Sequence, residues 1–208
     1  MNTVDKIKEN KIVAVIRNAN LDNILPIVKA LHKGGVNVVE ITAETPKVCS
    51  LTERVVDEVG DQMEIGVGTV LDPETARAVL MAGAQFIVTP TLNPDTIKIG
   101  NRYGIPTISG ALTPTEILTA YETGAEMVKV FPADLFGPNY IKNIHGPLPH
   151  IPIMVTGGIH LENFTSYLTQ GCAAVGIGSS LVNVKELYTE ADYNRLTEKA
   201  SEFVSKMK

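Results

Sequence analysis

The amino-acid sequence predicts an α/β fold in which eight parallel strands alternate with helices and close into a (β/α)8 TIM barrel. Three observations predict it: short runs rich in β-branched residues recur along the chain, segments with helical periodicity separate them, and Gly or Pro stands at most joints. No linker or low-complexity segment interrupts the alternation. We therefore expect residues 1–208 to form a single barrel domain with an extra helix at its N-terminus.

Eight runs have the composition of strands, and their spacing is that of βα units rather than of hairpins. The runs are apolar on both faces, as parallel strands covered by helices are. An open doubly wound sheet is the alternative, but its nucleotide-binding fingerprint, G-x-G-x-x-G after the first strand, is missing. The predicted strands are Ile12–Ile16, Val36–Ile41, Met63–Val67, Gln85–Val88, Ile105–Ile108, Glu126–Val130, Ile151–Val155 and Ala173–Ile177.

Helices are predicted before, between and after these strands. Residues 1–11 are polar and amphipathic, and residues 192–208 have the periodicity of a helix that closes the barrel. Apolar faces at helical spacing lie within residues 24–31 and 48–59. Gly ends most of the helices, and an N-cap residue followed by Pro begins three of them, at Asp72, Asn93 and Thr113.

The composition is that of a globular protein and excludes several function classes. Of 208 residues, 44% are hydrophobic, and 18 basic against 23 acidic side chains give a net charge of −5. Because the chain has no Lys/Arg block and no Trp, no nucleic-acid surface is expected. No apolar run is long enough for a membrane span or a signal peptide, so a cytoplasmic protein is expected. Cys49 and Cys172 do not make a disulfide framework, and the four histidines lack the spacing of metal ligands.

Small and polar residues gather at the C-terminal ends of the predicted strands, after otherwise apolar runs. In barrel enzymes the active site lies at this end. We therefore expect one site there, built from residues that are far apart in the sequence. In chain order the strand-end residues are Arg17, Glu40, Thr42, Gly68, Thr69, Thr89, Pro90, Ser109, Gly110, Lys129, Thr156, Gly157, Gly158, Gly178 and Ser179.

Two charged residues interrupt apolar strands. Lys129 lies between Val128 and Val130, where burial favours the neutral amine, and a neutral amine can attack a ketone to form a Schiff base. Glu40 follows Val39 in another strand, and a carboxyl group in a dry barrel mouth can shuttle protons. The alternative is that both residues are structural, each being the buried counter-ion of the other.

Glycine-containing loops follow the last two predicted strands. Residues 156–158 and the Gly178-Ser179 pair can present backbone N–H groups to an anion, and barrel enzymes commonly bind phosphate after strands 7 and 8. Arg17 ends the first strand, which neighbours strand 8 in a closed barrel, so its guanidinium can add a charge-assisted contact. The simpler interpretations are tight turns for the glycines and a solvated loop residue for Arg17.

These residues and their neighbours resemble the 2-keto-3-deoxy-6-phosphogluconate / 4-hydroxy-2-oxoglutarate aldolases, which are small class I aldolases built as (β/α)8 barrels. The matching segments follow the family's order over nearly the whole chain, and Lys-x-Phe-Pro-Ala is the most specific of them. The segments are Ile12–Arg17, Gly35–Thr42, Gly66–Val70, Phe86–Pro90, Leu112–Glu116, Lys129–Ala133 and Thr156–Ile159.

The resemblance implies a reaction and a role for ten of the strand-end residues. It implies cleavage of a 2-keto-3-deoxy-6-phospho sugar acid to pyruvate and glyceraldehyde 3-phosphate, and of 4-hydroxy-2-oxoglutarate to pyruvate and glyoxylate. Such enzymes need no metal or other cofactor and are usually homotrimers. The implied roles are a Schiff base on Lys129, general acid/base catalysis by Glu40, a pyruvate pocket lined by Thr69, Pro90 and Thr156, and phosphate binding by Gly157, Gly158, Gly178 and Ser179 with Arg17 nearby.

Two departures from the family pattern, and a likeness to one of its branches, leave the substrate open. Well-known members read Glu-Val-Thr-Leu-Arg, but Glu44 stands at the Arg position, where a carboxylate would repel an anionic substrate. Ser109 precedes Gly110 where Pro is usual. Residues 136–142 resemble the phosphogalactonate-cleaving branch, so the galacto epimer is an alternative substrate. A phosphosugar isomerase or epimerase that uses Glu40 without covalent chemistry, and a catalytically silent phosphosugar-binding protein, are further alternatives.

Overall fold

The computed structural model describes residues 2–207, and its sheet is a closed barrel of parallel strands. Each strand pairs with the next one along the chain, and β1 pairs with β8 to complete the ring. This confirms the predicted (β/α)8 barrel. The strands are β1 (Ile12–Ile16), β2 (Val38–Thr42), β3 (Glu64–Gly68), β4 (Phe86–Val88), β5 (Thr107–Ala111), β6 (Met127–Val130), β7 (Ile153–Thr156) and β8 (Ala174–Ile177).

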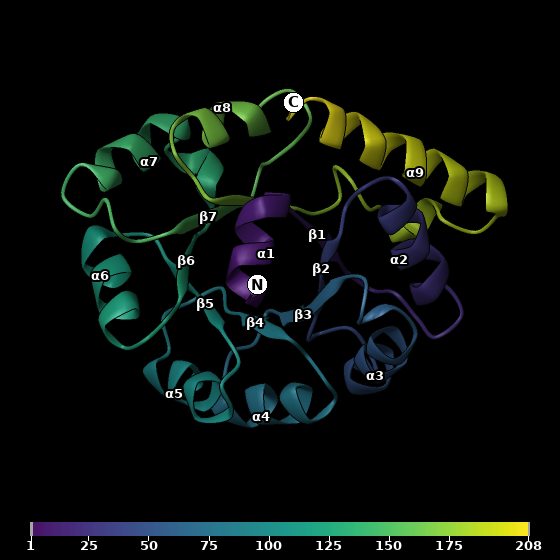
Figure 1. The fold of residues 1–208 in the computed structure, drawn as a ribbon, viewed down its shortest axis with the longest axis horizontal. Helices are drawn as coiled ribbons and strands as arrows, with labels where there is room; N and C mark the ends of the chain where they lie inside the picture. The colour runs from purple at the N-terminus through teal and green to yellow at the C-terminus, as the bar shows by residue number, and fades with distance from the viewer. Residues whose placement is uncertain (1, 208) are drawn as a thin grey trace.

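Helices surround the barrel, and α1 lies over the middle of the ring of strands in Figure 1. The last helix, α9, packs on α2, where the Thr197 hydroxyl donates a hydrogen bond to the carbonyl oxygen of Ala30 at 3.0 Å. The ring of helices therefore closes at the same place as the ring of strands. The helices are α1 (Thr3–Asn10), α2 (Ile24–Lys33), α3 (Val48–Val59), α4 (Pro73–Met81), α5 (Pro94–Tyr103), α6 (Pro114–Glu122), α7 (Pro138–His145), α8 (Phe164–Thr169) and α9 (Glu190–Ser205), with short 3-10 helices η1 (Ala133–Leu135) and η2 (Val184–Glu186).

The predicted strands and helix caps are present, with small shifts at their ends. The largest shift is at the end of β5, which extends to Ala111 rather than ending at Ile108. The same strand begins at Thr107 rather than Ile105, because Pro106 has no N–H to donate to a neighbouring strand. Asp72 caps α4 as predicted, since its Oδ1 accepts a hydrogen bond from the Thr75 N–H at 2.6 Å. Sequence patterns did not predict the two 3-10 helices, which are too short to show periodicity.

One group of apolar side chains fills the interior of the barrel near the start of the strands. Two residues of α1, Val4 and Ile7, pack into this interior cluster, and Lys6 of the same helix forms an ion pair with the buried Glu64 of β3. Helix α1 therefore closes the N-terminal end of the barrel. The strand residues of the interior cluster are Val13, Val38, Phe86, Val88, Ile108, Met127, Met154 and Ala174.

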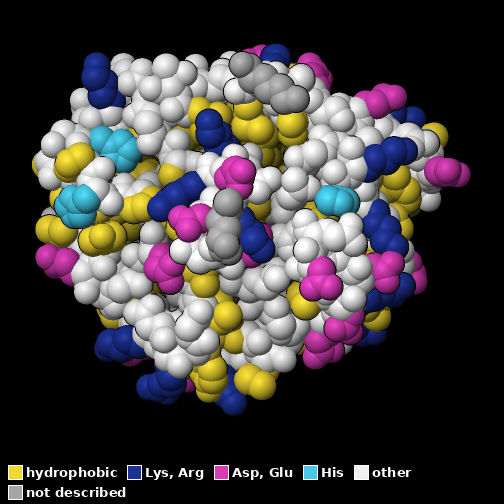
Figure 2. Space-filling view, in the orientation of Figure 1, with side chains coloured by type: hydrophobic (Ala, Val, Ile, Leu, Met, Phe, Trp, Pro, Cys, Tyr) yellow, Lys and Arg dark blue, Asp and Glu magenta, His cyan; other side chains and the backbone are white. Residues whose placement is uncertain are grey.

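The end covered by α1 carries charges of both signs. In Figure 2 basic and acidic side chains lie side by side over the centre of the barrel, where Figure 1 places α1. This helix contributes Asp5 and Glu9 as well as Lys6 and Lys8. No helix in the described part of the chain is both long and apolar enough to span a bilayer.

Candidate active site

The alternation of side chains along each strand turns three polar residues into the barrel above the interior cluster. Glu40, Lys129 and Thr156 each lie two residues after a member of that cluster and therefore share its inward face. All three are buried. Lys129 is in register with Gly110 of β5, and Glu40 is in register with Gly66 of β3, so each long polar side chain has a glycine beside it.

Lys129 is a buried amine without a carboxylate in direct contact. Only 4% of the residue is exposed, and its Nζ lies 5.2 Å from the centre of the Phe131 ring. This distance allows a favourable cation–π interaction when the amine is protonated. None of the described carboxylates forms an ion pair with Lys129. An amine held in this way is suited to nucleophilic catalysis.

Glu40 is completely buried, and neither of its carboxyl oxygens has a hydrogen-bond partner among the described residues. Burial raises the pKa of the Glu40 carboxyl, while the charges of Lys129 and Arg17 act in the opposite direction and the charge of Glu44 adds to the increase. The side chain of Glu40 has room because residue 68 is glycine: a Cβ there would lie 1.7 Å from Oε1 of Glu40. A carboxyl group in this state holds its proton to higher pH than an exposed one, which suits a proton shuttle.

Glu40 and Lys129 face the same interior, yet no ion pair joins them within residues 2–207. Their charges interact through space, because Lys129 lowers the pKa of Glu40. Two residues that served only as mutual counter-ions would be in direct contact. The geometry therefore gives no support to the interpretation in which each residue is only the counter-ion of the other.

A cavity of about 300 Å³ opens at the C-terminal ends of β1, β6, β7 and β8. It brings together residues from both ends of the sequence, as expected for a barrel whose first and last strands pair. We call this space the catalytic cavity. The predicted site residues that line it are Arg17, Lys129, Thr156, Gly157, Gly158, Gly178 and Ser179.

The other three predicted residues lie at the same end of the barrel but do not line the catalytic cavity. Glu40 is enclosed beside Gly68, as described above. Thr69 and Pro90 follow β3 and β4, whose ends are joined by a hydrogen bond from the Val70 N–H to the carbonyl oxygen of Val88 at 3.2 Å. The prediction that Thr69 and Pro90 contact pyruvate therefore has no support from the shape of this cavity.

Several residues of the cavity wall were not predicted. Val15 and Phe131 lie two residues from Arg17 and Lys129 on the same strands, so the alternation of β-structure could have identified them. No sequence signal pointed to His160, whose Nδ1 lies 2.7 Å from a carboxyl oxygen of Glu162. No group of three or more His, Cys, Asp or Glu side chains in residues 2–207 is arranged to hold a metal ion. The remaining unpredicted wall residues are Ile159, Gly176 and Ser180.

Arg17 forms an ion pair with Glu44, which connects the end of β1 to the loop after β2. The two side chains are 50% and 44% exposed. Arg17 lines the catalytic cavity, whereas Glu44 does not. The carboxylate of Glu44 is thus directed toward the Arg17 guanidinium and not toward the cavity. The positive charge of Arg17 partly compensates the repulsion between Glu44 and an anionic ligand.

The glycine loop after β7 runs close to the segment that follows Lys129. Gly157 and Gly158 have φ angles of +91° and +70°, in the left-handed region that favours glycine. A Cβ on Gly158 would lie 2.4 Å from Cβ of Asp134. Gly178 differs, because a Cβ there would meet nothing within 4 Å. Gly157 and Gly158 are therefore explained by the backbone path, whereas Gly178 borders open space.

Comparison with known proteins assigns the chain to a family. Residues 3–199 match the aldolase family described as KDPG and KHG aldolase. The chain is 38% identical over 171 residues to the 2-dehydro-3-deoxy-6-phosphogalactonate aldolase of Escherichia coli K12, which covers 82% of this chain and 83% of that relative. It is 36% identical over 162 residues to the 2-dehydro-3-deoxy-phosphogluconate aldolase of Pseudomonas aeruginosa, with 77% of this chain and 73% of that relative covered.

A solved structure shows the same fold over almost the same length. The KDPG aldolase of Legionella pneumophila, with pyruvate captured at low pH as a covalent carbinolamine intermediate, superposes with a TM-score of 0.85 at 30% identity. The superposition covers 92% of each chain. The family match, the curated relatives and the barrel agree, and the chain belongs to the KDPG and KHG aldolase family of carbon–carbon lyases.

Proposed function

We propose that this aldolase cleaves a 2-keto-3-deoxy-6-phospho sugar acid of the phosphogluconate type to pyruvate and glyceraldehyde 3-phosphate, and also cleaves 4-hydroxy-2-oxoglutarate to pyruvate and glyoxylate. The observation that carries this proposal is the placement of Lys129 and Glu40. Both point into the barrel at its C-terminal end, both are buried, and neither neutralises the other by direct contact.

The reaction begins when Nζ of Lys129 attacks the C2 carbonyl carbon of the keto acid. The resulting carbinolamine loses water and becomes an iminium ion, which is an electron sink. Glu40 takes the proton from the C4 hydroxyl, the C3–C4 bond breaks, and its electron pair moves toward the iminium nitrogen to form an enamine. The aldehyde leaves, the enamine is protonated at C3, and water hydrolyses the new iminium to pyruvate and the free amine.

The buried environment of Glu40 suits it to take up the proton of the C4 hydroxyl and to release it again. Burial raises its pKa, which favours the protonated form to higher pH than is usual for a carboxyl group. The covalent step is supported by the structure of the Legionella pneumophila relative, in which pyruvate is captured as a covalent carbinolamine intermediate. The buried Thr156 hydroxyl, which has no hydrogen-bond partner in the described chain and lines the cavity, would bind the pyruvate portion. The resemblance adds Thr69 and Pro90 to this pocket, although neither lines the cavity.

The phosphate of the substrate would bind between the loops after β7 and β8. Gly157, Gly158, Gly178 and Ser179 line the catalytic cavity, and so does Arg17, which follows β1, the strand paired with β8. Backbone N–H groups and a guanidinium are the usual partners of a phosphate in proteins. No cofactor is needed, because the iminium formed on Lys129 supplies the electron sink.

The galacto epimer of the substrate is the second candidate. The Escherichia coli relative at 38% identity is named for the phosphogalactonate substrate, and the Pseudomonas aeruginosa relative at 36% is named for phosphogluconate. Membership of an aldolase family argues against the isomerase and the silent binding protein. Turnover measured separately on the gluco, galacto and hydroxyglutarate substrates would rank the three.

Borohydride trapping tests the proposed mechanism directly. Incubation with pyruvate and reduction should add the mass of the reduced adduct to a peptide that contains Lys129, and Lys129→Ala should abolish both the adduct and turnover. Lys142→Ala removes an exposed lysine of α7 and should leave the adduct in place. A wild-type protein that forms no adduct would refute the Schiff-base mechanism.

We further propose that residues 1–208 act as one cytoplasmic domain that assembles as a homotrimer. Exposed apolar side chains support a subunit contact near the active end: Leu135 and Phe136 follow β6 and are 65% and 55% exposed, and Phe136 stacks on Tyr140. Sedimentation equilibrium should give about three times the chain mass of 22.4 kDa. Leu135→Asp should shift the protein toward the monomer, and a monomeric wild type would refute the trimer.

A further inference from the structure

A second groove lies beside the catalytic cavity and shares part of its wall. The groove has a volume of about 560 Å³, and three residues, Val15, Arg17 and Ser179, line both spaces. One side of the groove is the loop between β1 and α2, and the other side is the segment after β8 that contains η2. A ligand bound at Lys129 could therefore extend past Arg17 into the groove.

The groove is rich in hydrogen-bond donors and cations. Lys185 provides a positive charge, and Arg17 provides a second one that is partly compensated by its ion pair with Glu44; no acidic side chain is present among the described residues that line the groove. Lys185 is exposed and has no ion-pair partner in residues 2–207. Four side-chain amides complete the lining, from Asn18, Asn20, Asn23 and Asn183. We call this space the asparagine groove.

At the start of α2, hydrogen bonds hold the side-chain oxygens of two of these amides and leave their NH₂ groups available to donate. The side-chain oxygen of Asn20 accepts hydrogen bonds from the N–H groups of Asp22 and Asn23, at 2.9 and 3.1 Å. The side-chain oxygen of Asn23 accepts one from the Asn20 N–H at 2.7 Å. Because backbone N–H groups can only donate, both oxygens are committed, and the NH₂ groups of both amides remain as donors.

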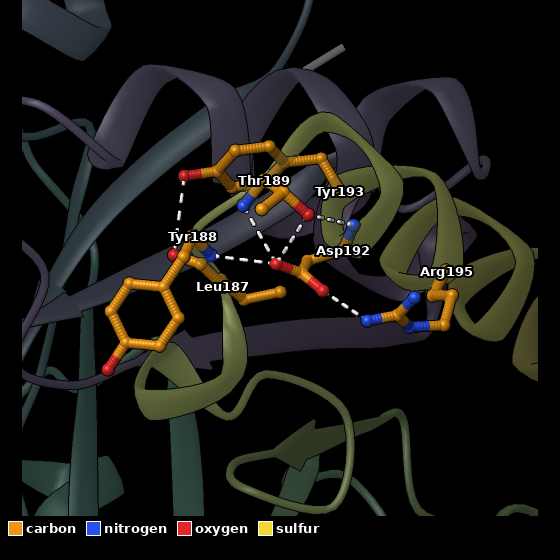
Figure 3. A network of polar contacts seen from close by, with 6 residues as sticks. All are labelled: Leu187, Tyr188, Thr189, Asp192, Tyr193 and Arg195. Carbon is orange, nitrogen blue, oxygen red and sulfur yellow. Dashed lines mark hydrogen bonds and ion pairs between the residues drawn. The ribbon is translucent and has the colours of Figure 1, made fainter.

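The opposite wall is anchored by the capping network of α9. Asp192 accepts hydrogen bonds from the N–H groups of Tyr188 and Thr189, and Thr189 caps the helix in return. Figure 3 shows this network, with the ring of Tyr188 projecting away from it. Tyr188, which lines the asparagine groove, is thus held at its backbone while its hydroxyl-bearing ring stays free for a ligand.

We propose that the asparagine groove binds the polyhydroxylated, phosphorylated end of an aldehyde longer than glyceraldehyde 3-phosphate, so that the enzyme also makes and cleaves longer 2-keto acids. Amide donors suit sugar hydroxyls, and the unpaired Lys185 suits a terminal phosphate. The proposal rests on the proposed function, since the aldehyde carbon must bond to C3 of the enamine formed on Lys129 while the aldehyde oxygen takes up a proton.

The experiment compares aldehydes of different length in the addition reaction with pyruvate. Glyoxylate serves as the short acceptor and erythrose 4-phosphate as the long one. We expect Lys185→Glu to lower kcat/KM for erythrose 4-phosphate about tenfold more than for glyoxylate. Asn183→Leu, which keeps the charge of the wall, should shift the same ratio in the same direction. Lys199→Glu makes the same charge change on an exposed lysine of α9 outside the groove and should leave the ratio unchanged.

The outcomes separate this inference from the proposed function. Equal effects of Lys185→Glu on both aldehydes, or a wild type that does not use erythrose 4-phosphate at all, would overturn the role of the asparagine groove. Pyruvate trapping on Lys129 would still succeed in that case. Failure of trapping would instead overturn the Schiff-base mechanism itself, whatever the aldehyde.

Discussion

At the scale of single residues, the buried carboxyl group of Glu40 links catalysis to stability. Burial without a hydrogen-bond partner raises its pKa above the ordinary value of 4.5. A native pKa above that of the unfolded chain means that the folded protein binds more protons between the two values. The free energy of unfolding therefore falls as the pH rises through that window and stays lower above it.

Glu40→Gln should consequently raise the free energy of unfolding at about pH 7.5, and the difference from wild type should vanish as the pH falls below about 4.5. The same change should lower kcat by about 100-fold or more, because it removes the group proposed as general acid/base. Urea denaturation at several pH values and steady-state kinetics measure the two effects. Glu53→Gln, at an exposed position of α3, is the matched control and should show neither. A Glu40→Gln protein less stable than wild type at neutral pH would contradict the burial argument.

The ion pair of Arg17 with Glu44 gives a second residue-scale prediction. Glu44→Gln removes a carboxylate near the mouth and frees the Arg17 guanidinium for an anionic ligand. Since both side chains are about half exposed, the effect should be modest: KM for the phosphorylated substrate should fall about two- to fivefold at low ionic strength and converge with wild type near 1 M salt. Glu58→Gln breaks another exposed pair, with Lys29, and should leave KM unchanged. A rise in KM would show that Glu44 positions Arg17 for the substrate.

At the scale of strands and loops, the fold was predictable because every unit follows the same rules. Apolar runs, glycine stops and caps such as Asp72 are local signals, and each appears where the sequence pattern places it. The inward direction of Lys129 and Glu40 also follows from alternation along β6 and β2. Two other features depend on how side chains of different loops meet around the mouth of the cavity. They are the pairing of Glu44 with Arg17, and the position of Thr69 and Pro90 outside the catalytic cavity. One-dimensional patterns carry no such information.

Gly68 of β3 tests whether strand geometry positions the acid/base. A Cβ on Gly68 would lie 1.7 Å from Oε1 of Glu40, so Gly68→Ala must move the Glu40 side chain. Displacement of a catalytic group by about 1 Å can reduce the rate roughly 100-fold. We expect kcat to fall by about that factor while pyruvate trapping on Lys129 persists. Gly146→Ala, after α7, is the control, because its nearest neighbour would be the carbonyl oxygen of Asn143 at 3.3 Å. A fully active Gly68→Ala enzyme would mean that Glu40 has room the structure does not show.

At the scale of the whole molecule, the two ends of the barrel have different tasks. The C-terminal end holds Lys129, the catalytic cavity and the asparagine groove. The N-terminal end is closed by α1, whose Ile7 is fully buried in the interior cluster. Barrel enzymes generally divide chemistry and stability between these two ends. Substitutions under α1 should therefore change stability without changing the reaction.

Ile7→Ala measures this separation. Loss of a buried isoleucine side chain should lower the free energy of unfolding by about 2–5 kcal/mol, because the cavity left behind under α1 is only partly filled by relaxation. Both kcat and KM should stay within about twofold of wild type at a temperature where the variant is folded. The reason is that none of the described residues lining the catalytic cavity belongs to the interior cluster. Glu9→Ala, at an exposed position of the same helix, should change neither stability nor kinetics appreciably. A large fall in kcat for Ile7→Ala would show that packing at the closed end is transmitted along the strands to Lys129 and Glu40, and that the two ends are not independent.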